Sequence, residues 1–309
     1  MNDKKLATTK RGLWPTIFFS PDESRLRAGW RLLLHTIMFV ILSTLVGTAL
    51  FIPIGLLHIS FDSQIALLFS ELTMLAGITL STFLARRFLD KRSMLSLGLK
   101  LDSLALTDIL AGIVITFFQM GAIFGLEMVL GWTKFEGFAW KTQSGAQVAI
   151  GVGLGLFIFI LTGWAEELLS RGYHLQTVES GLNMFWAVGI SSSVFAILHI
   201  SNPNATNMST LGIFAAGLFL ALPFVLTRQL WLSIGLHIGW NFFEGVVFGF
   251  PVSGTQTFQL MQHTVKGPEL WTGGAFGPEA GLIVFPALLL GALLVFLYAK
   301  SEIRKTIFK

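Results

Sequence analysis

Two adjacent glutamates and an arginine stand inside an apolar stretch, GWAEELLSRGYH (163–174). A charged residue at the centre of a membrane helix costs about 2.5–3.5 kcal/mol, so the chain needs a reason to keep three of them there. Glu167 and Arg171 are four residues apart; on a helix they share one face and can form an ion pair. Glu166 points about a quarter turn away, where Arg171 cannot reach it. The spacing therefore predicts a structural pair, Glu167–Arg171, and a free carboxylate, Glu166.

Two later apolar segments carry polar residues that could meet this free carboxylate. In SVFAILHI, Phe195 and His199 are four residues apart, and in LHIGWNFF the same spacing separates His237 from Asn241. Each pair occupies one helix face, and Glu244 follows near the face of the second pair. We interpret Phe195 as a packing residue and Glu244 as a structural one.

The depths of the three candidate side chains agree. If the helix that carries Arg171 continues to about Glu179, Glu166 lies about 20 Å from its end. His199 lies about 20–24 Å from the start of its helix, and His237 about 12 Å from the start of its own. We expect the three groups to meet near the middle of the membrane, in a cavity open toward the cytoplasm.

One free carboxylate, two imidazoles and an amide suit the hydrolysis of a peptide bond. Glu166 can take a proton from water as a general base, with His199 assisting. His237 and Asn241 can donate hydrogen bonds to the oxyanion that develops on the attacked carbonyl. The sequence has no cysteine and no G-x-S-x-G elbow, so a covalent nucleophile is unsupported.

Zinc is the alternative that these residues leave open. Glu166, His199 and His237 could together ligate Zn²⁺ and leave a position for water. The sequence has no H-E-x-x-H motif, which would place two histidine ligands on one helix. The three zinc ligands would instead have to come from three separate helices. We favour glutamate-activated water without a cofactor and keep Zn²⁺ as a possibility to test.

The elements that must position these residues are membrane helices. Of the 309 residues, 53% are hydrophobic and 12% are charged, about half the charge of a typical soluble domain. Stretches of about 20 apolar residues indicate spanning helices. The sequence predicts an all-α, polytopic membrane helix bundle with about eight spans, at 30–56, 64–85, 106–130, 146–168, 183–200, 209–227, 230–250 and 279–299.

Basic residues predict the orientation. They gather before the first span, between the second and third, and after the last, whereas loops such as LLHISFDSQ carry none. The positive-inside rule then predicts that both termini are cytoplasmic. The N-terminus has no apolar core followed by a cleavage site, and we interpret it as a retained tail. The expected organisation is a cytoplasmic tail (1–28), N-terminal transmembrane helices (29–144), a protease-like core (145–300) and a second cytoplasmic tail (301–309).

Other features receive structural interpretations. The glycines of AIGVGLGLF (149–157) indicate close helix packing. Glu71 and Glu127 lie in other spans with no motif around them, and we expect structural roles. The Gly-rich loop 251–278 could be an outside lid or a re-entrant segment.

The motifs resemble those of the CPBP family of intramembrane proteases, which includes the type II CAAX prenyl endopeptidases and bacterial immunity-type proteins. The family's EExxxR, FxxxH and HxxxN stand here, in the same order, as EELLSR (166–171), FAILH (195–199) and HIGWN (237–241). The run GPELWTGGAFGPEA (267–280) also resembles the bacterial branch. One departure is Ser170, where many relatives have an aromatic residue. The resemblance covers about 145–300.

The resemblance implies that Glu166 is the water-activating base, that His199 assists it, and that His237 and Asn241 bind the oxyanion. Glu167 and Arg171 would support the site. The expected partners are membrane lipids and a membrane-associated peptide or protein substrate, not nucleic acid. The expected location is a cell membrane, a bacterial inner membrane or, in a eukaryote, the endoplasmic reticulum. The alternative is a non-catalytic protein of the same fold, acting in binding, immunity or scaffolding; a transporter is less well supported, because no inverted repeat is evident.

Overall fold

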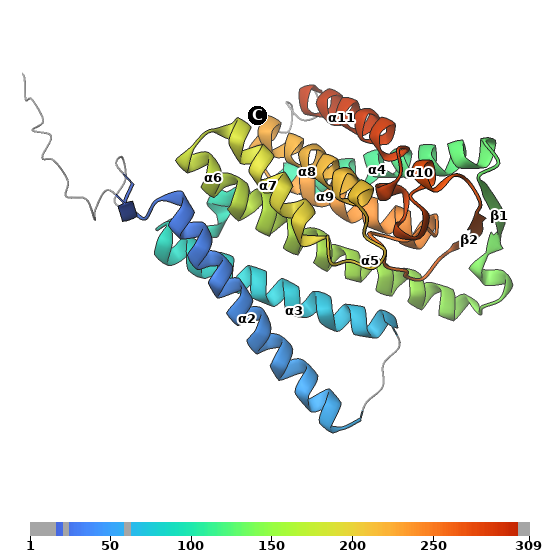
Figure 1. Cartoon of the computed structure of the whole chain (residues 1–309), viewed down its shortest axis with the longest axis horizontal. Helices are drawn as coiled ribbons and strands as arrows, with labels where there is room; N and C mark the ends of the chain where they lie inside the picture. The colour runs from blue at the N-terminus through green and yellow to red at the C-terminus, as the bar shows by residue number, and fades with distance from the viewer. Residues whose placement is uncertain (1–16, 21–24, 59–62, 302–309) are drawn as a thin grey trace, which may run out of the picture.

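The computed structural model describes residues 17–20, 25–58 and 63–301. Most of the two predicted tails therefore lies outside the described residues. The described part is a helix bundle with one small sheet (Figure 1). Its helices are α2 (Ala28–Leu56), α3 (Ser63–Leu84), α4 (Ser103–Val129), α5 (Gly145–Glu167), α6 (Leu175–Gly181), α7 (Met184–Leu198), α8 (Asn207–Thr227), α9 (Trp231–Asn241), α10 (Glu269–Thr272) and α11 (Val284–Lys300).

Three helices continue beyond these bounds as π-helical turns. The first follows α3 over Ala85–Leu89, the second joins α5 to α6 over Leu168–His174, and the third follows α9 over Phe242–Val247. The middle one makes Gly145–Gly181 a single helical segment of 37 residues. This confirms that the helix carrying Glu166 runs on beyond Arg171, and π-turns of this kind are frequent at functional sites.

Each of the eight predicted spans contains a helix, but the helices differ in length. Within the described residues, five segments are long and apolar enough to cross a membrane, and α7 and α11 are shorter apolar helices. The expected helix at 279–299 begins only at Val284, because Pro278–Ala280 forms a tight 3₁₀ turn before it. An all-helical bundle suited to a membrane is therefore observed, while the count of eight spans stays a prediction.

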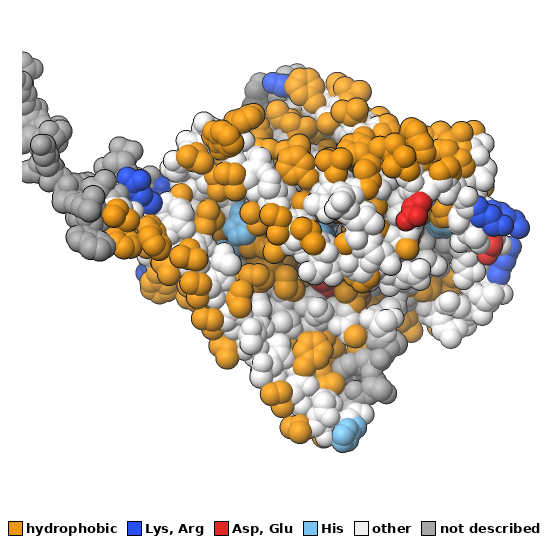
Figure 2. All heavy atoms as spheres, in the orientation of Figure 1, with side chains coloured by type: hydrophobic (Ala, Val, Ile, Leu, Met, Phe, Trp, Pro, Cys, Tyr) orange, Lys and Arg blue, Asp and Glu red, His pale blue; other side chains and the backbone are white. Residues whose placement is uncertain are grey.

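The outer surface of the bundle is apolar. Figure 2 shows hydrophobic side chains over much of the visible face, with few charged groups among them. Leu45 on α2, Phe118 on α4 and Leu289 on α11 are among the large hydrophobic side chains that are more than half exposed. Such an area would be unfavourable in water but is compatible with lipid.

Close backbone contact fixes α9 against α4. A Cβ atom added to Gly235 would lie 2.7 Å from the Cα of Ile109, and one added to Gly239 would lie 2.8 Å from the Cα of Ile113. Distances this short exclude any side chain, so both glycines are needed for the approach. Since α9 carries the HIGWN motif, these contacts help set where His237 and Asn241 lie.

Two of the three glycines of AIGVGLGLF also make close contacts, and the third does not. A Cβ on Gly151 would lie within 2.7 Å of the Phe258 ring, and Gly155 is similarly close to Val246, whereas Gly153 has open space around it. The predicted close packing is therefore confirmed for Gly151 and Gly155. Their contacts are with the segment after α9 rather than with another regular helix.

A two-stranded antiparallel sheet was not expected. Strand β1 (Thr133–Phe138), between α4 and α5, pairs with β2 (Met261–Val265), inside the long loop after α9. Figure 1 shows both strands at one end of the bundle, at the far end of α5 from α6. The pairing holds the 251–278 segment against the bundle, and its residues Ser253, Thr255 and Thr257 line an internal cavity.

Candidate active site

Helix α5 presents Glu166 and Glu167 at its C-terminal end, and a close contact holds this part of α5 on α9. A Cβ on Gly163 would lie 2.7 Å from Cγ1 of Ile238. The two helices can therefore approach at the level of the two glutamates. That closeness lets side chains from α5 and α9 meet directly.

Glu167 belongs to a buried group that is linked by hydrogen bonds to its Oε1 atom. Arg171 donates a hydrogen bond to Oε1 of Glu167 at 2.6 Å and a second to the carbonyl oxygen of Gly217 at 2.9 Å. His237 donates from Nδ1 to the same Oε1 at 2.8 Å. The Arg171 guanidinium also lies 4.6 Å above the Phe195 ring. The predicted Glu167–Arg171 pair is confirmed, and His237 is a third member that helical spacing alone could not identify.

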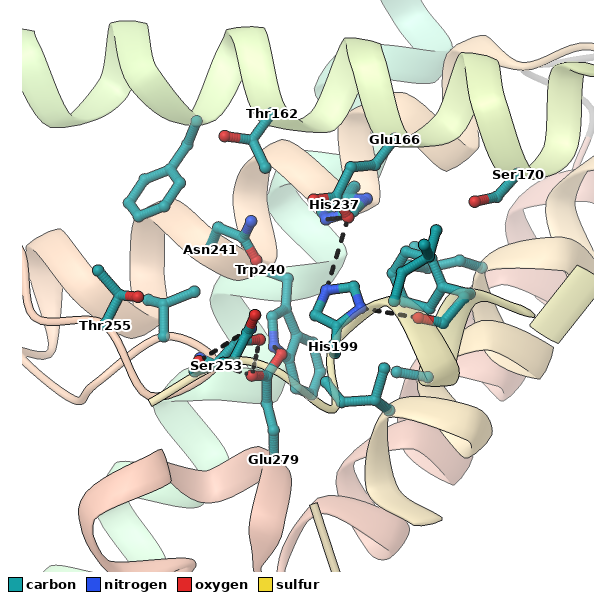
Figure 3. A pocket seen from close by; sticks show the side chains of 18 of the residues that line it. Thr162, Glu166, Ser170, His199, His237, Trp240, Asn241, Ser253, Thr255 and Glu279 are labelled. Atoms are coloured by element: carbon teal, nitrogen blue, oxygen red, sulfur yellow. Dashed lines mark hydrogen bonds and ion pairs between the residues drawn. The ribbon is translucent and has the colours of Figure 1, made fainter. Parts of the chain in front are cut away.

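Glu166 faces the other way, into a cavity of about 340 Å³ (Figure 3). Its Oε2 lies 3.7 Å from Nε2 of His199 and 3.7 Å from Nε2 of His237. These separations are too long for direct hydrogen bonds, but a water molecule on the cavity side could bond to the carboxylate and to an imidazole. The Glu166 side chain keeps 24% of its surface exposed, whereas Glu167 keeps none.

The hydrogen bonds on Nδ1 determine how the two imidazoles face Glu166. His199 Nδ1 lies 2.8 Å from the carbonyl oxygen of Phe195, which can only accept, so this nitrogen carries the proton. His237 Nδ1 carries a proton for the same reason, since its partner is the Glu167 carboxylate. Both rings are thus held with Nε2 toward the carboxylate of Glu166.

Asn241 lies one turn after His237 on α9 and also lines the cavity. Figure 3 shows Asn241 and Thr162 beside Glu166 and His237, and Ser170 on the opposite side of Glu166 from Thr162. The four residues predicted as catalytic, Glu166, His199, His237 and Asn241, therefore surround one space. What each contributes to a reaction stays a prediction.

Two further carboxylates line the cavity, and sequence reasoning did not place them there. Glu71, on α3, accepts a hydrogen bond of 3.0 Å from the Thr162 hydroxyl. The structure thus adds a position on the cavity wall to the expected structural role of Glu71, and that role stays a prediction. The signal that could have found it is a glutamate in the middle of an apolar span.

Glu279, from the turn before α11, is the second addition. Its Oε2 accepts hydrogen bonds from the backbone N–H and the hydroxyl of Ser253, at 2.8 and 2.6 Å. Its Oε1 accepts one from Nε1 of Trp240 at 3.2 Å. Glu279 thereby ties the 251–278 segment to α9 at the edge of the cavity. Its sequence context, GPEA, gave no indication of this role.

The remaining candidates fit structural roles. Glu127 accepts a hydrogen bond of 2.5 Å from the Thr133 hydroxyl and is buried, as expected. Glu244 is fully buried and is not among the residues that line the cavity. Its two carboxylate oxygens have no hydrogen-bond partner in the described structure, so the expected pairing with another helix is not observed. Phe195 packs its ring 4.6 Å from that of His199, in agreement with its interpretation as a packing residue.

The fit of a metal can be tested on the same geometry. Two imidazole nitrogens and a carboxylate are donor types that Zn²⁺ accepts. Within the described residues, however, no group of three His, Asp or Glu side chains is arranged to hold a metal ion. These residues are thus not identified as a metal site in the described structure, and Zn²⁺ stays an alternative for experiment.

Comparison with known families now gives the class. Residues 148–243 match the family model described as Type II CAAX prenyl endopeptidase Rce1-like. The match covers 96 of the 309 residues and supports a CPBP-family intramembrane protease, of the CAAX type in general. The match includes all three motifs, from Glu166 to Asn241, while Glu71 and Glu279 lie outside it. No curated protein shows a significant match to the chain.

Proposed function

We propose that this protein is an intramembrane endopeptidase that hydrolyses a peptide bond of a membrane-associated substrate with a water molecule activated by Glu166. The observation that carries the proposal is the position of the Glu166 carboxylate, 3.7 Å from each of two imidazole Nε2 atoms in a cavity among apolar helices. The family match to residues 148–243 supports a protease of this class.

The first step is attack of water on the scissile carbonyl. Water between Glu166 and His199 gives a proton to the carboxylate as its oxygen bonds to the carbonyl carbon. Nε2 of His199 can accept a hydrogen bond from the second O–H of this water, because Nδ1 of the ring already holds its proton toward Phe195. The ring thus orients the water as well as adding basicity.

The second requirement is stabilisation of the oxyanion. The Glu167 carboxylate holds His237 through Nδ1, with Nε2 toward the cavity, and a hydrogen bond from this Nε2 to the oxyanion is part of the proposal. The amide of Asn241, one turn further along α9, is the second donor. The oxyanion then re-forms the C=O bond, the C–N bond breaks, and Glu166 gives its proton to the nitrogen of the leaving amine. This step restores the Glu166 carboxylate.

The orientation that goes with this function is eight spans with both termini in the cytoplasm. Three long helical segments, Ala28–Leu56, Ser63–Leu89 and Asn207–Thr227, begin or end beside arginines, in agreement with the positive-inside rule. The substrate would then meet the cavity from within a cell membrane.

The test is cleavage by the purified, detergent-solubilised chain and by Glu166→Gln, with a library of fluorogenic, membrane-compatible peptides. The control is Glu127→Gln, which alters a buried glutamate outside the cavity and should keep activity. Cleavage lost in Glu166→Gln alone, and insensitive to chelators, supports glutamate-activated water. Stoichiometric zinc whose removal abolishes cleavage would instead make Glu166, His199 and His237 its ligands. A physiological role that survives Glu166→Gln would favour the non-catalytic alternative.

A further inference from the structure

A short stretch of the 251–278 segment has main-chain groups without hydrogen-bond partners. Within the described residues, no backbone hydrogen bond involves the N–H or C=O groups of Gln256, Thr257, Phe258 or Gln259. The Thr257 hydroxyl reaches the carbonyl oxygen of Phe258 only at 3.5 Å, at the limit of a hydrogen bond. Unpaired peptide groups are unfavourable beside lipid, so these groups need water or another peptide chain as a partner. We call residues 255–259 the open segment.

The open segment has the form of an unpaired strand. Beyond Thr255 it contains no helix or turn, and none of its residues has a positive φ. Thr255 and Thr257 line the active-site cavity, whereas Gln256 between them is exposed and does not line it. Side chains that alternate between two faces are typical of an extended chain. Such a chain offers its N–H and C=O groups along its edges, where another strand can pair with it.

The start of the open segment is held at the cavity. Val252 and Thr255 exchange two backbone hydrogen bonds, of 2.9 and 2.8 Å, across a tight turn. Within this turn, Ser253 donates to Glu279 through its N–H and its hydroxyl, and its carbonyl oxygen accepts a hydrogen bond of 3.1 Å from the Asn202 side chain. Asn202 and Glu279 both line the cavity, and Figure 3 shows Ser253 between Thr255 and Glu279.

The other end of the open segment is fixed as well. The Phe258 ring occupies the space that a Cβ atom on Gly151 of α5 would need. The side-chain amide of Gln259 donates to the carbonyl oxygen of Gly249 at 2.6 Å. Gly151 lies about 22 Å before Glu166 along α5, so the open segment leads from the cavity toward the start of that helix. A strand held at both ends loses little freedom when another chain pairs with it.

We propose that the open segment binds the substrate as an extended strand, through main-chain hydrogen bonds to residues on one side of the scissile peptide bond. The inference rests on the proposed protease function and adds how the same site holds its substrate. In strand addition, main-chain hydrogen bonds provide affinity and the pockets for alternate side chains provide specificity. The substrate class that fits is a membrane-associated segment that readily becomes extended, such as one rich in β-branched residues.

The primary experiment measures the period of contact along a bound peptide. The sequence has no cysteine, so Gln256→Cys gives the chain a single thiol, and Glu166→Gln in the same chain prevents cleavage. The probes are palmitoylated decapeptides of leucine, valine and serine, each with one cysteine, activated as a thiopyridyl disulfide, at successive positions. The thiol of the protein displaces thiopyridone and forms a disulfide with the peptide, and mass spectrometry measures the yield. We expect yields that alternate with a period of two residues, because a paired strand places every second side chain on the face of Gln256.

The matched control is Gln262→Cys in the same Glu166→Gln chain. Gln262 belongs to the same long segment, but it lies in β2 opposite Gly137 and does not line the cavity. It should give low yields with no alternation. At Gln256, a period near 3.6 residues would mean a helical substrate, and equal yields at all positions would mean no pairing; either result overturns the proposal. Alternation of equal strength at Gln262 would also overturn it, since the pairing would then belong to the edge of the sheet.

A second experiment uses cleavage by the unaltered chain. Successive backbone nitrogens of a cleaved library peptide are methylated, which removes one N–H at a time. We expect kcat/KM to fall about two- to tenfold, mainly through KM, at alternate positions on one side of the scissile bond, since each lost hydrogen bond contributes about 0.5–1.5 kcal/mol. An equal fall at every position, or none at any, would overturn the proposal.

The two experiments separate this proposal from the protease function on which it rests. Alternating crosslinks at Gln256 without cleavage of any peptide would support binding of an extended chain by the open segment, while the protease function would fail. Cleavage without alternation in either experiment would support the protease and overturn strand pairing with the open segment.

Discussion

The two adjacent glutamates of α5 lie in opposite surroundings. Glu167 has no exposed surface, and a single one of its oxygens accepts hydrogen bonds from both Arg171 and His237. Glu166 is partly exposed to a cavity, and the two imidazoles nearest to it stand just beyond hydrogen-bond distance. A buried charge that is paired contributes to the stability of the fold, whereas a carboxylate left open beside oriented imidazoles is available for chemistry. The difference predicts distinct consequences for stability and for activity.

The largest expected effect is on the Glu167 side. Arg171→Leu should lower the free energy of unfolding by about 3–5 kcal/mol, because it leaves a buried carboxylate without its cation. Chemical denaturation in detergent measures the loss. Arg228→Gln is the control: it breaks an exposed pair with Glu179, and such pairs contribute about 0.2–1 kcal/mol. Equal losses in the two variants would contradict the assignment of Arg171 to a buried supporting role.

Substitutions beside Glu166 should lower the rate of cleavage more than the stability of the protein. His199→Gln is expected to slow cleavage about 10²–10⁴-fold, as the loss of a positioned acid–base group does, with little change in stability. His199 bonds to one backbone carbonyl, so few native contacts are lost. His237→Asn should reduce both rate and stability, since His237 also bonds to Glu167. Activity and thermal midpoint are measured on the same preparations; a stable, fully active His199→Gln would exclude His199 from the reaction.

The same contrast explains what the sequence could predict. The Glu167–Arg171 pair follows from helical geometry alone, because residues four apart share a face. The meeting of Glu166, His199 and His237 follows from three motifs and a common depth, which needs only helix ends and a rise per residue. Both features depend on positions within one helix or on helix ends, and for that reason they could be predicted from the sequence.

Features that depend on contacts between residues far apart in the sequence could not be predicted. Strand β1 pairs with β2 across more than 120 residues. In neither strand is the alternation of hydrophobic and polar residues strong enough to predict a strand from the sequence. Glu279 reaches the cavity only because its turn packs onto Ser253 and Trp240. A glutamate within an apolar span, such as Glu71, is costly to bury and so indicates a special position. No motif around Glu71, however, shows which helix its side chain faces.

The next prediction concerns the close packing of α9 against α4. Gly235→Ala should destabilise the protein by about 1–3 kcal/mol, because the new methyl group would overlap the α4 backbone at Ile109. Gly153→Ala, with open space around it, should be neutral or slightly stabilising. Because α9 carries His237 and Asn241, Gly235→Ala should also lower activity. Comparing the denaturation midpoints and cleavage rates of the two variants tests this; equal midpoints would contradict the close contact of α4 with α9.

The smallest expected effect concerns Thr162, which links Glu71 to the cavity. Thr162→Val keeps the shape of the side chain but removes the hydrogen bond to Glu71, and a bond of this kind contributes about 0.5–1.5 kcal/mol. If Glu71 only shapes the cavity, stability should fall by about that amount and the pH profile of cleavage should stay unchanged. Thr107→Val, on the exposed face of α4, removes a hydroxyl bonded only to the backbone and serves as the control. A shifted pH profile in Thr162→Val alone would mean that Glu71 takes part in the protonation of the site. The contrast between the open Glu166 and the paired Glu167 would then have to include a third carboxylate, Glu71.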